Sequence, residues 1–245
     1  AIDFNELRLP WFDYWLKGES NGIDKTKKVN IFVMGKNKWK ESDVWPLNNT
    51  SYTNYYLNKE FNGEIDSVHS GSLSEKKENE NSQISFTNNL KNPVPSLGGN
   101  TLSIPNGVFE HSEIDKQCIT FSTNPLENEL EVTGPVSAEI YVNSNHQNSD
   151  WIVRLCDIDE SGYSRIVSDG IYRASGNPGE TQKINVDMWA TSNMFLKGHK
   201  LRVSVTSSCF PRFDRALNGE SEKSENNLLC GGSNASYIKL PIINN

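Results

Sequence analysis

Short apolar runs that alternate with polar residues restrict most strongly what this chain can fold into. Beyond residue 17, runs rich in β-branched and aromatic side chains are broken repeatedly by Gly, Pro, Asn and Ser. In the clearest run, residues 200–206, Leu and Val can face one side of a strand while Arg202 and Ser204 face the other. About eleven such runs with little helix between them predict a mainly β fold of two packed sheets, a jelly-roll β-sandwich.

The residues between the runs predict where the chain turns. The sequence DESG, from Asp159 to Gly162, predicts a hairpin turn in which Gly162 is free to adopt a positive φ. Two polar stretches, residues 70–81 and 218–227, are predicted to be exposed loops. Strands are expected at residues 29–34, 52–57, 83–87, 117–122, 129–132, 136–143, 151–157, 164–168, 182–186, 200–206 and 237–242.

The N-terminal end is the only part of the chain with helical periodicity. Trp11, Trp15 and Gly18 recur at spacings of four and three. Pro10 is tolerated in a first turn, and Gly18 stands where a helix would stop. Leu7, Trp11 and Trp15, which we call the helix stripe, share one face and have the pattern of a buried face. If nothing covers the stripe, it leaves a large apolar patch.

A short motif after this helix resembles a catalytic one. The sequence GESNG, from Gly18 to Gly22, fits the G-x-S-x-G pattern of a serine-hydrolase elbow, with Ser20 at the nucleophile position. Such an elbow needs a strand, a sharp turn and then a helix. Here a predicted helix precedes the motif and a β-rich run follows it, so we expect Ser20 to lie in a linker. An autonomous enzyme that uses Ser20 is the less favoured alternative.

The charge and the cysteines exclude several classes of function. The formal net charge of −7 argues against a nucleic-acid or anionic-membrane partner, because both need clustered Lys and Arg. No apolar run approaches the ~18–20 residues of a membrane span. The four cysteines contain no C-x-x-C pair, so a zinc or redox site is not expected. A reducing, cytoplasmic setting fits them better than a disulfide framework.

Recognisable catalytic and cofactor motifs are missing from the sequence. The four histidines, His69, His111, His146 and His199, belong to no known base or metal-binding motif and are expected at the surface or in turns. No glycine-rich phosphate-binding loop occurs. We therefore expect no metal and no cofactor.

Two groups of residues invite other interpretations. The six tryptophans could stack on sugars, as in a free-standing carbohydrate-binding module, although large aromatic side chains mostly supply burial. Directly after a predicted strand, Arg212, Asp214 and Arg215 are close enough to form a structural ion-pair cluster. Phe210 and Phe213 could anchor this cluster. A docking surface for another domain is the alternative for this segment.

Several segments are distinctive when they are read together. They are LRLPWFDYWLKG (7–18), VNIFVMGKNKW (29–39), NPVPSLGGN (92–100), LEVTGPVSAEIYVNSN (130–145), SDGIYRA (168–174), MFLKGHKLRVSVTSSCFPRFDRALN (194–218) and ASYIKLPII (235–243). In this order, and over about residues 2–243, they resemble the C-terminal part of the cocaine-esterase / NonD hydrolase family. That family is related to X-Pro dipeptidyl-peptidases and α-amino-acid ester hydrolases.

The resemblance implies a noncatalytic domain. In that family an α/β-hydrolase domain with a Ser-Asp-His triad comes first, and a jelly-roll domain with a galactose-binding-like fold follows. Residues 1–20 would be the terminal helix of the hydrolase domain, and residues 21–245 would be the sandwich. The triad would lie upstream of Ala1, so this chain alone should be inactive. The whole serine hydrolase would cleave esters or amides through an acyl-enzyme.

The resemblance also implies a pocket and partners. Leu102, Ser103 and Ile104 match the loop that, in the family, reaches the active-site cleft and helps to line the acyl pocket. The hydrolase domain of the same polypeptide would pack against the helix stripe. A homodimer is a further expectation, because members of the family often dimerise.

Overall fold

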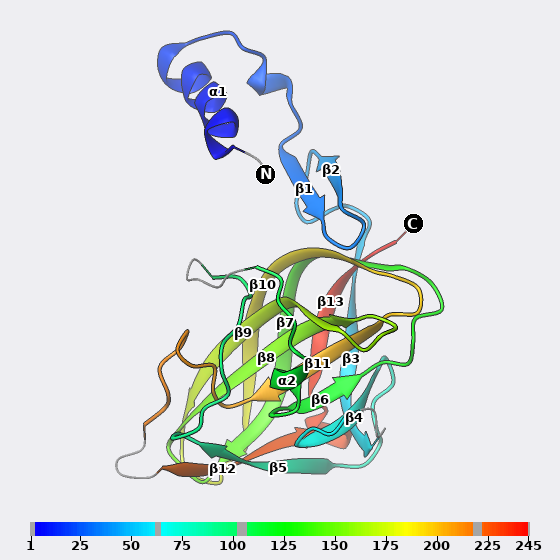
Figure 1. Ribbon diagram of the computed structural model, residues 1–245, viewed down its shortest axis with the longest axis vertical. Coiled ribbons are helices and arrows are strands. Elements are labelled where there is room, and N and C mark those ends of the chain that lie inside the picture. Colours follow the sequence, from blue (N-terminus) through cyan, green and yellow to red (C-terminus); the bar gives the residue numbers. More distant parts are fainter. Residues whose placement is uncertain (1–2, 62–64, 102–106, 218–221, 245) are drawn as a thin grey trace.

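A β-sandwich with a helix and a hairpin at one end makes up the structure. The computed structural model describes residues 3–61, 65–101, 107–217 and 222–244 (Figure 1). The helices are α1 (Phe4–Lys17), α2 (Ser112–Asp115) and the 3-10 turns η1 (Ile23–Lys25) and η2 (Gly232–Asn234). The strands are β1 (Val29–Val33), β2 (Lys38–Ser42), β3 (Thr50–Phe61), β4 (His69–Ser74), β5 (Ser82–Asn89), β6 (Ile119–Ser122), β7 (Leu130–Ser144), β8 (Asn148–Ile158), β9 (Ser164–Ser175), β10 (Gln182–Phe195), β11 (Lys200–Thr206), β12 (Lys223–Cys230) and β13 (Tyr237–Ile243).

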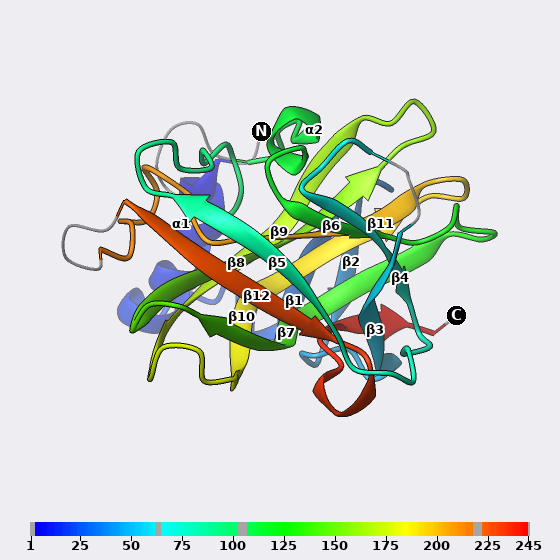
Figure 2. The same cartoon turned by 90° about the horizontal axis from the view of Figure 1, so that it is seen from below.

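The sandwich is one continuous path of strands that curls around a single core. Its order is β5-β12-β7-β13-β3-β4-β6-β11-β8-β9, and β10 pairs with β7. Figure 2 shows β5 and β12 side by side across the end of the sandwich that lies away from α1. Every strand from β3 to β13 contributes a buried apolar side chain to the core, whose largest members include Trp151, Phe121 and Phe195. The predicted mainly β, jelly-roll sandwich is therefore confirmed.

The predicted helix forms and ends where its sequence indicates. The Asp3 side chain caps the N-terminus by accepting a hydrogen bond from the Asn5 amide at 2.8 Å. Gly18 adopts the left-handed φ of 74°, and its amide donates to carbonyls of the last turn, which is the expected C-cap. Pro10 lies inside the helix rather than in its first turn. Its carbonyl accepts a hydrogen bond from Asn21 Nδ2 at 2.6 Å, so the chain after the helix folds back onto it.

Several strands are too polar in composition to be predicted from apolar alternation. The predicted loop at residues 70–81 begins with strand β4, and the predicted loop at 218–227 runs into β12, so both expectations are wrong for these residues. On β4, a Cβ at Gly71 would lie 2.4 Å from the Asn58 carbonyl oxygen and 2.8 Å from the Phe121 ring. Small residues are thus required there because two neighbouring strands approach closely. The alternation pattern also misses strand β2, and the two strands expected at residues 129–132 and 136–143 are one strand, β7, which begins at Leu130.

The outer face of β11 is buried as well as the inner one. Leu and Val of this strand enter the core as predicted, but Arg202 and Ser204 on the opposite side are also only 2% and 0% exposed. Helix α2 covers them and inserts Asp115, whose carboxylate accepts from Ser164 Oγ at 2.8 Å and Ser204 Oγ at 2.6 Å. Arg202 Nη1 lies 3.2 Å from the same carboxylate. A satisfied polar cluster therefore fastens α2 to the sheet.

Removing the Asp115 carboxylate should destabilise the fold strongly. Asp115→Ala removes a buried carboxylate that Arg202, Ser164 and Ser204 all contact, so we expect the free energy of unfolding to fall by about 3–5 kcal/mol in urea denaturation. Glu113→Ala on the same helix removes only a surface pair with Lys116 and should change it by less than about 1 kcal/mol. Equal losses in the two variants would contradict the assigned role of Asp115.

Candidate functional site

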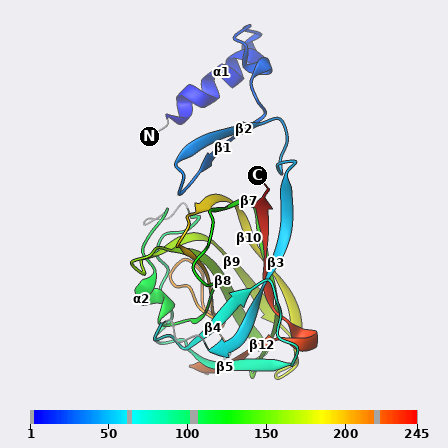
Figure 3. The ribbon, with the colours of Figure 1, turned by 90° about the vertical axis from the view of Figure 1, so that its right-hand side faces the viewer.

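The helix stripe lies exposed in this structure. Leu7, Trp11 and Trp15 are 53%, 50% and 61% exposed, and α1 buries none of its residues. The Trp11 and Trp15 rings lie 6.1 Å apart and form one apolar surface. Figures 1 and 3 show α1 standing clear of the sandwich, so the expectation of a buried stripe is not met within this chain. A patch of this kind is typical of a surface that another protein surface covers.

The β1–β2 hairpin adds exposed aromatic side chains between the helix and the sandwich. Phe32 and Trp39 pack edge to face at 5.3 Å and are 41% and 51% exposed. The hairpin itself is fixed to β10, because the Met34 amide donates to the Ser192 carbonyl at 3.0 Å and the Met194 amide donates to the Met34 carbonyl at 2.8 Å. The aromatic pair is therefore held in place while its outer side stays open.

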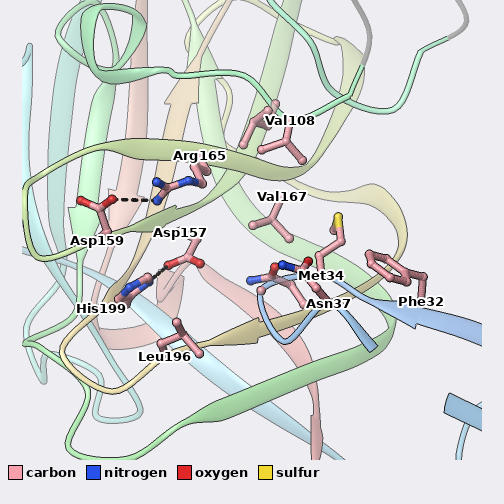
Figure 4. Close-up of a pocket in the computed structure, with 13 residues that line it drawn as sticks. Phe32, Met34, Asn37, Val108, Asp157, Asp159, Arg165, Val167, Leu196 and His199 are labelled. Atoms are coloured by element: carbon pink, nitrogen blue, oxygen red, sulfur yellow. Dashed lines mark hydrogen bonds and ion pairs between the residues drawn. The ribbon is translucent and has the colours of Figure 1, made fainter. Parts of the chain in front are cut away.

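A cavity of about 650 Å³ lies between the turn of this hairpin and the ends of β8, β9 and β10 (Figure 4). Apolar side chains that include Met34, Val108 and Val167 line one part of it, and charged side chains line the other. A second cavity of about 400 Å³ shares these three residues and extends to Gly99 and Asn100. The two cavities thus lead from the charged residues to the segment that precedes residues 102–106.

The charged part of the larger cavity contains an aspartate–histidine pair. His199 Nδ1 lies 2.8 Å from Asp157 Oδ1, and the two side chains are only 16% and 7% exposed. Burial raises the pKa of Asp157, and the neighbouring His199 offsets part of this effect. His199 lies at a turn, as expected, since its amide donates to the Leu196 carbonyl at 3.1 Å, but its side chain is paired and largely buried. The described residues that line this cavity include no serine, threonine or cysteine, so they form no nucleophilic triad.

The predicted hairpin turn bounds the same cavity and is confirmed. Gly162 has a φ of 85°, and its amide donates to the Asp159 carbonyl at 2.9 Å. The Asp159 carboxylate accepts from Ser161 Oγ at 2.6 Å and from Arg165 Nη1 at 2.9 Å. These bonds lower the pKa of Asp159 to about 2, with the Ser161 bond as the largest cause. Arg165 is thereby held in an ion pair at the rim.

Arg212 fixes the base of the loop for which a pocket-lining role was predicted. Its Nη1 lies 2.5 Å from Asp169 Oδ2 on β9, and its Nη2 donates to the Asn100 carbonyl at 2.6 Å. The backbone of Gly99 pairs with that of Gly107 across the loop, with hydrogen bonds of 2.8 and 3.1 Å. Leu102, Ser103 and Ile104 lie between these two glycines but outside the described residues. The structure thus holds both ends of their segment.

The predicted ion-pair cluster is assembled differently. Asp214 forms no ion pair with Arg212 or Arg215 in the part of the chain that the structure describes; its backbone carbonyl instead accepts from Arg173 Nη2 at 2.8 Å. Arg215 Nη1 donates to the Leu90 carbonyl at 2.5 Å. The guanidinium groups of Arg212 and Arg215 do lie over the rings of Phe213 and Phe210, at 5.0 and 5.2 Å. The partners of the arginines are remote in sequence, which is why proximity along the chain misidentified them.

Two buried residues beside this cluster were not anticipated. His111, expected at the surface or in a turn, is 1% exposed, and its Nε2 donates to the Leu97 carbonyl at 2.6 Å. Burial lowers the pKa of His111. Asp169, the ion-pair partner of Arg212, is 2% exposed. The sequence does contain one sign that Asp169 is buried and paired: an acidic residue stands inside the strand-like stretch 167–171, where a charge needs a partner.

The described residues offer no alternative centre. Ser20 lies exposed between α1 and η1, in the predicted order of helix, turn and strand. Across the described ranges, no group of His, Cys, Asp and Glu is arranged to hold a metal ion. None of the described helices is long and apolar enough to cross a membrane. All four cysteines are free and buried.

The Arg212–Asp169 pair gives a test of the corrected cluster. Arg212→Ala leaves the buried Asp169 carboxylate unpaired, so we expect the free energy of unfolding to drop by about 3–5 kcal/mol in urea titrations. Asp214→Ala removes a carboxylate that is in no ion pair with either arginine and should cost less than about 0.5 kcal/mol. A large loss for Asp214→Ala would restore the original prediction.

Comparisons with known proteins place the chain in a family. A family model described as the X-Pro dipeptidyl-peptidase C-terminal non-catalytic domain matches residues 21–239. The cocaine esterase of Rhodococcus sp. (strain MB1 Bresler) is 35% identical over an alignment that covers 97% of this chain and 45% of that protein. A putative serine esterase of Mycobacterium bovis is 24% identical over 84% of this chain and 36% of its own length.

Solved structures share the fold. An aminopeptidase from a marine sediment archaeon, Thaumarchaeota archaeon, superimposes with a TM-score of 0.80 at 20% identity, over 98% of this chain and 44% of that one. The chain spans less than half the length of each of these relatives. The chain therefore belongs to the X-Pro dipeptidyl-peptidase C-terminal non-catalytic domain family, which forms the C-terminal part of CocE/NonD-type hydrolases.

Proposed function

We propose that this chain supports the α/β-hydrolase domain of a serine hydrolase that cleaves esters or amides. The observation that carries the proposal is the exposed helix stripe, because three large apolar side chains on a capped, regular helix need a covering surface. The hydrolase domain of the same polypeptide is that surface. Residues 1–20 are then structurally part of the hydrolase domain, and residues 21–245 form the supporting sandwich.

Catalysis belongs to the hydrolase domain in this proposal. There a serine attacks the substrate carbonyl and an acyl-enzyme forms, with histidine as the base and aspartate as its orienting partner. The Asp157–His199 pair does not serve this reaction, since no nucleophile lines its cavity among the described residues. The role of the sandwich is to position the surface that closes one side of the active-site cleft.

The segment that contains Leu102, Ser103 and Ile104 lines the acyl pocket in this proposal. Support comes from the base of the loop, where Arg212 binds both Asp169 and the Asn100 carbonyl. A loop whose two ends are tied to a rigid sheet can present side chains to a partner domain at a defined position. The small Ser103 would leave room for a larger acyl group than an apolar bulky residue would.

We also propose a cytoplasmic location and a reducing environment. Four free, buried thiols need no oxidising compartment, and burial raises the pKa of Cys118 and of Cys230 to about 12, so both remain protonated thiols at neutral pH. The predicted homodimer stays a prediction.

Docking through the helix stripe can be tested with paired measurements. The double variant Trp11→Asp and Trp15→Asp should leave the unfolding of this chain alone within about 1 kcal/mol, because neither side chain is buried in it. In the polypeptide that joins the chain to its hydrolase domain, the same change should lower Tm by several degrees and reduce ester hydrolysis, because charges would enter the interface.

Two controls keep this test specific. Glu6→Gln on the same helix should leave both Tm values nearly unchanged, and the isolated chain should hydrolyse no p-nitrophenyl ester. The proposal fails if the double variant unfolds the isolated chain, or if it changes neither the Tm nor the ester hydrolysis of the joined polypeptide. Ester hydrolysis by the isolated chain that disappears in Ser20→Ala would instead favour an autonomous enzyme.

The acyl-pocket role of the loop predicts a change in substrate preference. Ser103→Phe should reduce kcat/KM for esters of bulky acids relative to acetate esters by about tenfold or more, because the added ring would occupy acyl space. Thr87→Phe, on strand β5 at the far end of the sandwich, is the matched control and should leave the ratio unchanged. An unchanged ratio in Ser103→Phe would remove the loop from the pocket.

A further inference from the structure

An exposed tryptophan with a left-handed backbone stands on strand β10. Trp189 has a φ of 65° and is 58% exposed. Only one other non-glycine residue in the described ranges, Asn37, has a positive φ, and asparagine tolerates that conformation far better than tryptophan does. A large aromatic residue in this conformation is a strained element that the surrounding structure must hold in place.

The strain is held by a β-bulge that is fixed on both sides. The β7–β10 register shifts between Asp187 and Ala190, so Trp189 and its neighbour both point outward. The Trp189 amide donates to Asp187 Oδ1 at 2.9 Å, and Met188 before it is fully buried. Ser168 Oγ on β9 donates to the Met188 carbonyl. The indole is therefore mounted on a rigid backbone, although no burial of its own holds it.

The bulge borders the surface that the proposed function assigns to the hydrolase domain. Ala190, the next residue, lines the cavity of about 400 Å³ together with Phe32 of the hairpin and Gly99 and Asn100 at the base of the acyl-pocket loop. Asp169, which binds Arg212, lies next to Gly170 on β9, and a Cβ at Gly170 would lie 2.1 Å from the Asp187 carbonyl oxygen. The bulge and the loop base are thus neighbours.

We propose that Trp189 is an anchor by which the sandwich grips the hydrolase domain beside the acyl pocket. This inference rests on the proposed function and adds to it a second contact, remote in sequence from the helix stripe. A rigid tryptophan loses little conformational freedom on binding and buries a large apolar area, which is the character of an interface hot spot. Its neighbour Ala190 lines the same cavity as Phe32 of the exposed hairpin pair, so the tryptophan follows directly on a residue of that cavity.

A protein surface fits this tryptophan better than a sugar does. Sugar recognition needs free polar side chains around the aromatic ring to bind the hydroxyl groups. Beside the bulge, Ser168 is buried and donates to the Met188 carbonyl, and Asp187 Oδ1 accepts from the Trp189 amide, so both help to hold the bulge itself. The indole itself is a broad, exposed apolar surface, which matches an apolar recess on a partner domain.

The anchor is tested by measuring the Tm of one variant both in the isolated chain and in the polypeptide that carries the hydrolase domain. Trp189→Gly relieves the positive φ, so the isolated chain should keep its Tm or gain a few degrees. In the polypeptide that carries the hydrolase domain, the same variant should lower Tm by about 4 °C or more and reduce ester kcat/KM severalfold, because the interface contact is lost. Trp189→Phe should recover most of both losses. Asn37→Gly, a matched relief of positive φ, should act alike in the two polypeptides.

Three results would overturn the anchor. Equal losses of Tm in both polypeptides would make Trp189 a structural residue of the sandwich. If Trp189→Gly causes no loss of Tm in the joined polypeptide, Trp189 is not in the interface. If only the Trp11 and Trp15 double variant then lowers Tm there, the anchor is wrong but the proposed function stands. Quenching of the isolated chain's fluorescence by xylo-oligosaccharides, absent in Trp189→Gly, would identify a sugar platform instead.

Discussion

The buried carboxylate of Asp115 is the interaction on which the arrangement of the sandwich depends. The sheet around β8, β9 and β11 has an apolar face in the core and an opposite face that carries Arg202, Ser204 and Ser164. A charged group beneath a covering segment is tolerated only if it is paired and hydrogen-bonded. Asp115 provides that pairing, so helix α2 lies on the sheet. The loop base at Gly99 and Asn100, where Arg212 binds the Asn100 carbonyl, belongs to the same stretch of chain as α2 and leads into this buried polar cluster.

The paired charged groups and the exposed aromatic side chains lie in different parts of the molecule. Around Asp115 and Asp169 the charged groups meet their partners inside the protein, through Arg202 and Arg212 respectively. At the end of the molecule that carries α1 and the β1–β2 hairpin, aromatic side chains are left open instead. In the described chain, these buried carboxylates are paired with arginines, whereas the end that carries α1 and the hairpin leaves aromatic side chains exposed. This arrangement is expected of a domain that has its own core and also contacts a second domain through an apolar surface.

Local sequence patterns predicted the fold well where one residue decides the outcome. Gly18 and Gly162 adopt the left-handed φ expected of a helix C-cap and a hairpin turn, and the alternation of residues 200–206 predicted strand β11. Prediction failed where the outcome depends on distant residues. Gly71 belongs to a strand because Phe121 and Asn58 approach it, and Arg212 binds Asp169 because β9 lies beneath it. The family followed from the order of whole segments, whereas the pocket-lining residues fall outside the described ranges.

Because the connection between α1 and β1 is short, a weak contact between the two domains is enough to keep them together. Only residues 19–28 separate the end of the helix from the first strand. If the helix is built into the hydrolase domain, this tether keeps the sandwich at an effective concentration in the millimolar range. Association then becomes an intramolecular event, and a patch that would bind only weakly between separate molecules can stay closed most of the time. The tether also allows brief opening of the cleft without loss of the partner, a route by which substrates could enter and products leave.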